Sequence, residues 1–183
     1  MKQGAFFLFL LIAFPAFAAS ANSPADAASA FYRVYAGQRG AGGIPDATAR
    51  QRFAAVLSPR LNRQLADAAA AQARLSAKVK NAVPPMLEGD IFSSLFEGAT
   101  DWQVGACKDD GKTARCPVAL THAQPLPSPT SKTPQPAHWN DTLVLTNTPA
   151  GWKVDDVIYD AGFAFGNTGR LSDMLAMVVA SNP

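Results

Sequence analysis

The chain has 183 residues, a length typical of one domain, and its 16 lysines and arginines nearly balance its 14 acidic residues. The formal net charge of +2 therefore gives no reason to expect nucleic acid or an anionic membrane surface as a partner. Without an N-terminal leader, a chain of roughly 165 residues could still bury about two-thirds of its unfolded surface, which is enough for a hydrophobic core.

The N-terminus has the pattern of an export signal. Lys2 supplies a small positive charge, residues 5–14 are apolar, and residues 16–18 have the small–x–small pattern of a cleavage site. A second site with the same spacing ends at Ala21. The apolar run holds about ten residues, whereas a membrane span needs roughly 20, so we expect a cleaved leader and not an anchor.

We therefore expect a signal peptide at residues 1–18, with cleavage after residue 21 as the alternative, and a single domain at residues 22–183. No later segment is apolar enough over a sufficient length to cross a bilayer, and no cysteine near the cleavage site could carry a lipid. The expected location is the periplasm or the cell exterior.

Three helices are expected first, beginning after Ser23, near Asp46 and after Ser58. Serine and aspartate are favoured caps, and each serine is followed by a proline, which suits the first helical position. The apolar stripes of these helices, expected to face the core, are Ala27, Phe31, Val34 and Tyr35, then Ala49, Phe53, Val56 and Leu57, then Leu61, Leu65, Ala68, Leu75 and Val79.

A fourth, short helix is predicted over residues 88–98, with Asp90 as its cap and Gly98 at its end. Its apolar residues would close one end of the core.

Strands are predicted at roughly residues 101–107, 113–121, 138–147 and 151–159. The last two flank a turn at residues 148–151 and are the strongest hairpin signal in the chain. Helices followed by an antiparallel meander indicate an α+β fold, in which helices pack on a sheet of about four strands.

Prolines punctuate residues 124–136, so we expect a long exposed loop with polyproline character there, as a recognition surface or simply a flexible connection. A C-terminal helix, capped by Ser172, completes the domain.

The two cysteines, Cys107 and Cys116, flank a turn signal at residues 109–112. A hairpin that reverses near Gly111 would bring them together, and an oxidising compartment would favour a disulfide bond. The alternative, a redox-active pair, would need a C-x-x-C motif, which is absent.

Several sequence pieces resemble an exported bacterial family of unknown function within the nuclear-transport-factor-2-like (SnoaL-like) superfamily. They are Phe31-Tyr32-x-x-Tyr35, Leu57-Ser58-Pro59-x-Leu61, residues 88–92 and 94–98, the two cysteines, Trp139-x-Asp141-Thr142-Leu143, the strand at residues 151–159, and residues 165–172. The resemblance implies a cone-shaped fold, with a curved sheet around a pocket that helices close. The superfamily includes isomerases, cyclases and dehydratases as well as non-enzymatic binding modules, so it implies no catalytic residues here.

Asp155 and Asp156 are neighbours on the last strand, so their side chains should point to opposite faces. If Trp152 and Ile158 mark the inner face, Asp156 points inward. A buried carboxyl group has a raised pKa unless charges or hydrogen bonds offset the burial. Asp156 is then a candidate base or ligand anchor, or more simply a structural hydrogen-bond hub.

Two other places carry candidate polar groups. Glu88 and Asp90 lie together on one loop and could bind a cation or a polar ligand. In an antiparallel strand pair the numbers of facing residues have a constant sum. His122 and His138 would therefore face each other if that sum is 260. A third ligand is not evident, so no metal site and no cofactor are expected, and His122 remains a candidate imidazole base.

Three aromatic residues, Tyr35, Trp102 and Tyr159, are further candidates for the lining of a pocket, although aromatic residues at such positions are usually core. The sequence lacks a G-x-S-x-G elbow, a Walker loop and an H-E-x-x-H motif. We therefore expect a binding or protein-interaction domain, for a small ligand or an envelope protein. The alternatives are a SnoaL-like isomerase or dehydratase with Asp156 or His122 as base, and an envelope inhibitor or immunity-type protein.

Overall fold

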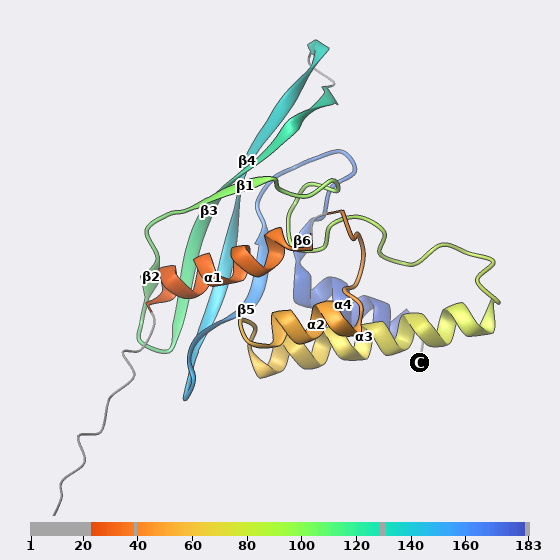
Figure 1. Ribbon diagram of the computed structural model, residues 1–183, viewed down its shortest axis with the longest axis horizontal. Coiled ribbons are helices and arrows are strands. Elements are labelled where there is room, and N and C mark those ends of the chain that lie inside the picture. The colour runs from red at the N-terminus through yellow and green to blue at the C-terminus, as the bar shows by residue number, and fades with distance from the viewer. Residues whose placement is uncertain (1–22, 39, 129–130, 182–183) are drawn as a thin grey trace, which may run out of the picture.

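The fold is described from a computed structural model, for residues 23–38, 40–128 and 131–181 (Figure 1). It is an α+β fold with four helices and one antiparallel sheet in the described part of the chain. The predicted leader lies outside the described residues. None of the described helices has the length and apolar character needed to cross a membrane.

The three predicted N-terminal helices are confirmed, as α1 (Pro24–Ala36), α2 (Ala47–Ala54) and α3 (Pro59–Lys78). Each expected cap accepts a backbone hydrogen bond, because Ser23 Oγ, Asp46 Oδ1 and Ser58 Oγ lie 3.1, 2.8 and 3.0 Å from the amide nitrogen three residues later. The capping side chains therefore determine where the helices begin.

The sheet has six strands, so the prediction of about four was wrong. The strands are β1 (Asp101–Val104), β2 (Lys108–Asp109), β3 (Thr113–Ser128), β4 (Ser131–Thr148), β5 (Gly151–Tyr159) and β6 (Gly169–Arg170). Their order is β1-β3-β4-β5-β6, with β2 pairing to β3, and every pairing is antiparallel. The two extra strands hold two residues each, too few to show a strand pattern in the sequence.

The two predicted reversals of the sheet are confirmed. β4 and β5 are joined by Pro149 and Ala150, with Gly151 at a positive φ of 86°. Cys107 and Cys116 form a disulfide bond across the turn that contains Gly111, and their Cα atoms are 4.2 Å apart. The bond ties the chain between β1 and β2 to β3.

The prediction of a long loop at residues 124–136 was wrong, because β3 and β4 continue past the body of the sheet as a two-stranded arm (Figure 1). Leu126 pairs with Gln135 in the arm. The prolines lie at every second position on either side of these two residues. Since the N–H groups of a strand alternate between its two edges, such prolines remove donors from one edge only and leave the other free to pair.

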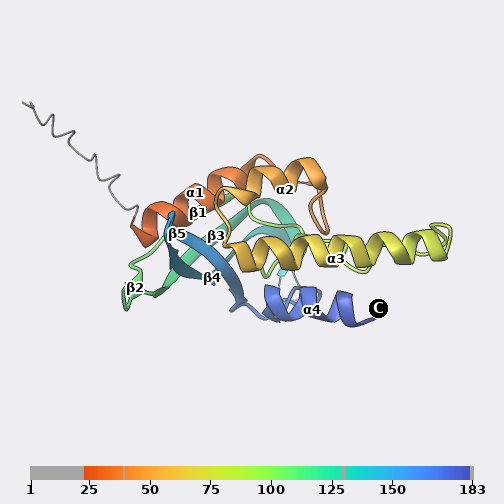
Figure 2. The same ribbon diagram turned by 90° about the horizontal axis from the view of Figure 1, so that it is seen from below.

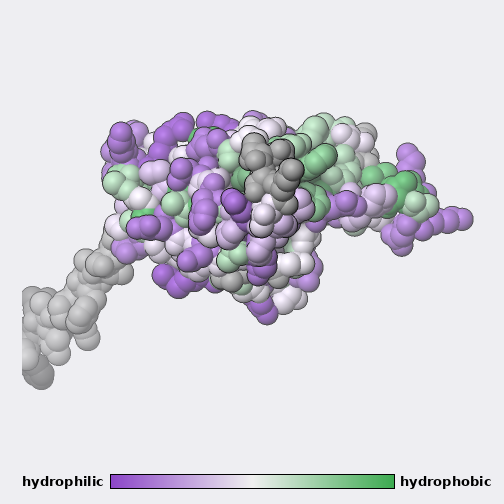
Figure 3. All heavy atoms as spheres, turned by 90° about the horizontal axis from the view of Figure 1, so that it is seen from above, coloured by the Kyte–Doolittle hydropathy of each residue, from purple (hydrophilic) through white to green (hydrophobic). Residues whose placement is uncertain are grey.

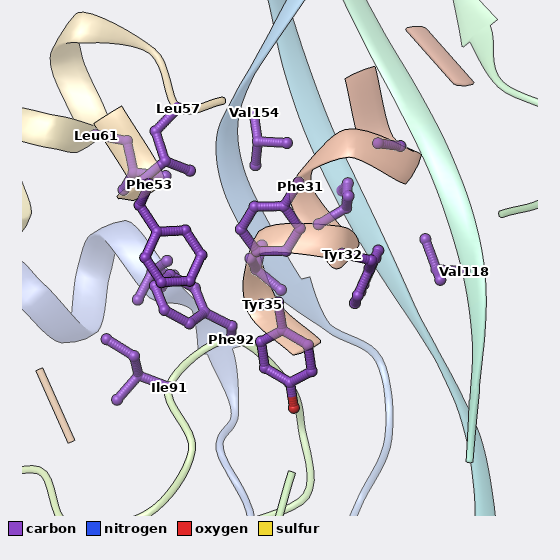
Figure 4. Close-up of a cluster of buried hydrophobic side chains, with 14 of the residues drawn as sticks. Phe31, Tyr32, Tyr35, Phe53, Leu57, Leu61, Ile91, Phe92, Val118 and Val154 are labelled. Atoms are coloured by element: carbon purple, nitrogen blue, oxygen red, sulfur yellow. The ribbon is translucent and has the colours of Figure 1, made fainter. Parts of the chain in front are cut away.

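The helices lie on one side of the sheet and at its end. α1 crosses the face formed by β1, β3, β4 and β5, whereas α3 packs against α4 (Leu171–Ser181) near β5, as Figure 2 shows. The centre of the core is aromatic: Phe92 lies 4.7 Å from Phe53 and 5.5 Å from Phe31 between ring centroids (Figure 4).

Residues 88–99, here called the plug segment, contain no helix, so the predicted short helix was wrong. Asp90 accepts the amide of Phe92 at 2.7 Å, which is a local turn and not the start of a helix. The predicted burial of Ile91, Phe92 and Leu95 at one end of the core is confirmed, whereas the predicted burial of Phe96 was wrong, because its side chain is exposed.

Candidate functional site

Two adjoining hollows lie between the loop after α1 and the plug segment. The first has a volume of about 170 Å³ and the second about 200 Å³, and both are lined by Gln38, Ala41, Gly42 and Asp90. We treat them as one groove, with the glycine-rich loop on one side and the plug segment on the other.

The glycines of the groove allow two backbones to approach each other closely. The Gly43 amide donates to the Gly89 carbonyl oxygen at 2.7 Å, and a Cβ at Gly42 would lie 1.9 Å from the Glu88 carbonyl oxygen. Gly43 also has a positive φ of 78°. A side chain at Gly42 would push the loops apart, so this glycine is required for the shape of the groove.

Asp90 stands where the two hollows meet. Its carboxylate accepts hydrogen bonds from Tyr35, from the Phe92 amide at 2.7 Å and from Ser93. Burial outweighs these donors and raises the pKa of Asp90 from its usual 3.8 to about 6. The groove therefore contains a carboxyl group that changes its charge in a mildly acidic range.

Tyr35 links this carboxylate to the end of the plug segment. Its hydroxyl oxygen accepts the Ala99 amide at 2.7 Å, and the hydroxyl group donates to Asp90. Burial and the neighbouring Asp90 carboxylate raise the pKa of Tyr35, so the hydroxyl keeps its proton at neutral pH. The structure thus brings together two of the predicted ligand-binding candidates, Tyr35 and Asp90.

The second hollow is acidic on one side and aromatic on the other. Glu88, Asp90 and Glu97 line it together with the ring of Phe96, which is 46% exposed. Two ion pairs of the described chain lie elsewhere, between Arg60 and Asp155 and between Arg170 and Asp156. Glu88, one of the candidate polar groups of the sequence, therefore also lies at the groove.

One exposed apolar side chain, Phe96, lines the groove. The large exposed apolar side chains among the described residues are Val83, Met86, Phe96, Phe165 and Met177. Seen from above, the half of the molecule toward the end of α3 carries most of the apolar surface, and the other half is mainly hydrophilic (Figure 3).

Asp156 lies away from the groove, and the predicted alternation of β5 fails there. A bulge between Val154 and Asp156 pairs Val157 with Leu143 on the core face and Asp156 with Val144 on the opposite face. Asp156 accepts the amide and hydroxyl of Ser172 at 3.0 and 2.7 Å.

This arrangement also corrects the prediction for the last helix. Ser172 lies inside the first turn of α4 and does not cap it, while the Asp156 carboxylate binds the start of the helix. Arg170 lies 3.5 Å from the same carboxylate. Asp156 is a hydrogen-bond hub that fastens α4 to β5.

The two histidines do not meet. Residue numbers of the paired strands sum to 259 at this point, so His122 stands opposite Ala137 and His138 opposite Thr121. The difference of one residue from the assumed register puts the histidines on opposite faces. His122 is buried and its Nδ1 lies 2.7 Å from the Gly98 carbonyl oxygen, which suits a structural contact at the end of the plug segment.

The remaining aromatic candidates belong to the core and do not line the groove. Trp102 stacks on Tyr32 with 5.6 Å between ring centroids. Tyr159 donates its hydroxyl to the Ile91 carbonyl oxygen at 2.7 Å, and burial raises its pKa. Tyr159 thus anchors the plug segment.

One buried carboxylate, Asp141, was missed as a site residue by sequence reasoning. It accepts the Ser94 amide at 2.7 Å, the Ser94 hydroxyl, the Trp139 indole at 3.0 Å and the Asp160 amide at 3.1 Å. Burial raises its pKa, although these donors oppose the rise. The motif Trp139-x-Asp141-Thr142-Leu143 was the only signal for Asp141 in the sequence, and it did not indicate the hydrogen-bond partners of this carboxylate.

Among the residues that the structure describes, no three histidine, cysteine, aspartate or glutamate side chains are placed to hold a metal ion. Comparison with protein families, curated proteins and solved structures finds no match to this chain. The arrangement of the groove is therefore the basis for any functional conclusion.

Proposed function

We propose that this protein is an exported, non-enzymatic binding protein whose groove holds a small organic cation, either free or as a lysine or arginine side chain of an envelope protein. One observation carries the proposal: three carboxylates and an exposed aromatic ring line one hollow.

The chemistry of the lining supports a cation over a neutral or anionic ligand. Carboxylates attract a positive charge, and a cation over an aromatic ring gains roughly 0.5–2 kcal/mol from the negative face of that ring. Phe96 offers its ring beside Glu88 and Glu97, and Gln38 adds an amide. A combined volume of a few hundred cubic ångströms suits a ligand group of about ten heavy atoms.

Three further observations support export and family membership. The Cys107–Cys116 disulfide fits an oxidising compartment, as does the leader pattern of residues 1–18. Helices that cover one face of an antiparallel sheet support a cone-shaped, nuclear-transport-factor-2-like arrangement, which we propose on the basis of the sequence resemblance.

The proposal is tested by titrating the protein with choline, cadaverine and arginine amide, followed by NMR and calorimetry. We expect binding to at least one cation, with shifted resonances at residues 88–97, and no binding of the neutral isostere 3,3-dimethylbutanol. The variants Glu97→Gln and Phe96→Leu should each weaken binding about threefold to tenfold.

The matched control is Asp67→Asn, which removes an exposed carboxylate on α3 that does not line the groove, and it should bind like the original protein. Equal binding of the cations and the neutral isostere, or equal weakening by Asp67→Asn, would contradict a cation site in the groove.

A second candidate function is an isomerase or dehydratase, and one observation favours it. Asp90 has a pKa raised to about 6 and adjoins the Tyr35 hydroxyl in a groove, which suits a general base with an orienting partner. Asp90 would then replace Asp156 and His122 as the base. Chemical conversion of a bound probe during the same NMR titration, abolished by Asp90→Asn, would support this function.

A further inference from the structure

The end of α3 projects from the body of the molecule. Figure 2 shows α3 continuing past the ends of α2 and α4, and Figure 1 shows the chain after α3 returning to the body as a loop. The return begins with a defined turn: Lys80 and Asn81 have positive φ angles of 51° and 57°, and the Asn81 amide donates to the Ser76 carbonyl oxygen at 2.9 Å. Residues 74–87 are here called the tip.

The tip carries an uninterrupted run of exposed apolar residues. Residues 82–86 read Ala-Val-Pro-Pro-Met, and all five are exposed, with exposed fractions of 49% for Val83 and 37% for Met86. Single exposed apolar residues are common on protein surfaces, but several in succession are unfavourable in water unless they serve a function. Figure 3 shows apolar surface at this end of the molecule with hydrophilic residues on either side of it.

The charges of the chain are distributed unevenly, although the net charge of +2 gave no reason to expect an anionic surface as a partner. Residues 46–80 contain seven lysines and arginines but two acidic residues, whereas residues 81–183 contain six basic and eleven acidic residues. Within the tip every charged residue is basic, and Arg74, Lys78 and Lys80 are all exposed. The tip therefore combines apolar surface with positive charge on a molecule that is almost neutral as a whole.

We propose that the tip docks on an anionic phospholipid bilayer, with Val83 and Met86 entering the interface and Lys78 and Lys80 lying against the lipid phosphates. This surface is separate from the proposed function, because the tip carries the contact and the ligand of the groove takes no part in it.

A bilayer fits this combination better than a protein or a nucleic acid. A projecting tip reaches a flat surface without the rest of the molecule, whereas a stable protein partner needs a broad complementary patch. Apolar side chains enter the boundary between headgroups and acyl chains, and each lysine near an anionic leaflet strengthens binding about fivefold. A nucleic acid would attract the lysines, but its phosphate backbone offers no favourable contact to a run of aliphatic residues.

The two prolines of the run favour insertion into the interface. A backbone N–H group that leaves water without a hydrogen-bond partner is unfavourable there, and Pro84 and Pro85 have no N–H group. Lysine side chains are long enough to reach the phosphates while their stems lie beside the apolar residues. Because the apolar run is short, we expect binding that is weak, reversible and sensitive to salt.

Co-sedimentation with vesicles tests the tip, with protein purified after export so that a cleaved leader does not contribute. We expect binding to vesicles of phosphatidylglycerol and phosphatidylcholine, and about tenfold weaker binding to phosphatidylcholine alone or in about 0.5 M salt. The double variant Lys78→Gln with Lys80→Gln should weaken binding about twentyfold. The matched control, Lys108→Gln with Lys112→Gln, removes the same charge from exposed positions near β2, at the other end of the molecule (Figure 1), and should bind within about twofold of the original protein.

Val83→Trp provides a second measurement, which gains a signal and does not depend on loss of binding. Its added fluorescence should shift to shorter wavelength on anionic vesicles, because the indole enters the interface. Ala150→Trp, in the exposed turn between β4 and β5, is the matched control and should show no shift.

Three results would overturn the proposal: no binding of the original protein to anionic vesicles, equal binding to neutral vesicles, or equal weakening by the two pairs of lysine substitutions. Binding to soluble heparin without binding to vesicles would also overturn it and would assign the tip to a soluble polyanion.

Discussion

The long hairpins and the plug segment occupy the same core but are stabilised in different ways. β3, β4 and β5 pair along extended antiparallel registers, interrupted at a bulge in β5 and at shifts in the arm, so most of their residues contribute to a backbone ladder. The plug segment has no ladder and is held by side chains at Asp90, Asp141 and Tyr159, with single backbone bonds from Gly43 and Asn167. A ladder spreads its stability over many bonds, whereas the plug segment concentrates it in a few buried polar groups.

This difference makes the two regions respond unequally to substitution. A buried carboxylate that several donors share is costly to remove, because each donor is then left without a partner. Loss of a single bond in the sheet, such as the disulfide bond, leaves the other hydrogen bonds of the ladder in place. The three predictions below test this contrast, from the largest expected effect to the smallest.

The largest effect is expected for Asp141→Ala. The change leaves the Ser94 amide, the Trp139 indole and the Asp160 amide without their acceptor in a buried site. We expect a loss of about 3 kcal/mol in the free energy of unfolding, measured with urea. Asp141→Asn keeps one acceptor oxygen and should lose less stability. The control Asp67→Asn, at an exposed position of α3, should have a free energy of unfolding within about 0.5 kcal/mol of that of the original protein. A loss for Asp141→Ala as small as that of Asp67→Asn would contradict the contrast.

An intermediate effect is expected when the disulfide bond of the sheet is removed. The double variant Cys107→Ala with Cys116→Ala should lose about 2.5 kcal/mol in the free energy of unfolding. The disulfide joins cysteines with a sequence separation of 9, and without it this loop is no longer closed in the unfolded chain. Reduction of the original protein should lower the urea midpoint in the same direction. The part of the hydrogen exchange in the plug segment that occurs by local opening, and not by global unfolding, should be unchanged. Selective loss of protection in that segment would show that the two regions are coupled.

The smallest effect is expected for Tyr32→Phe. The Tyr32 hydroxyl is buried between α1 and the sheet and has no hydrogen-bond partner within the described chain. Its removal leaves the ring free to stack on Trp102, so stability should be unchanged or rise by up to about 1 kcal/mol. Calorimetric melting provides the measurement. A loss above roughly 1 kcal/mol would indicate an ordered water or another partner at that hydroxyl.

Local signals in the sequence were sufficient for many elements. Serine–proline and aspartate caps placed the starts of α1, α2 and α3, and a glycine at positive φ marked the turn that the disulfide closes. These features form through interactions between residues only a few positions apart, so a short stretch of sequence is enough to predict them.

The candidate site could be predicted only in part. Glu88, Asp90 and Tyr35 were identified as polar or aromatic groups, but their common groove depends on Gly42 and Gly43 lying against the backbone of Glu88 and Gly89. A contact between two loops some 45 positions apart has no local signature.

The sequence by itself determined the helix starts, the disulfide and the β4–β5 hairpin, because each results from interactions between near neighbours. Only the tertiary structure decided the arm, where cross-strand pairing overrides the local preference of the prolines, and the bulge that turns Asp156 away from the core. It also decided the shape of the plug segment, since Asp141, Tyr159 and Asn167 supply its hydrogen bonds from distant parts of the chain. Burial then sets the charge of Asp90, because desolvation depends on what packs around a carboxyl group and not on its neighbours in sequence.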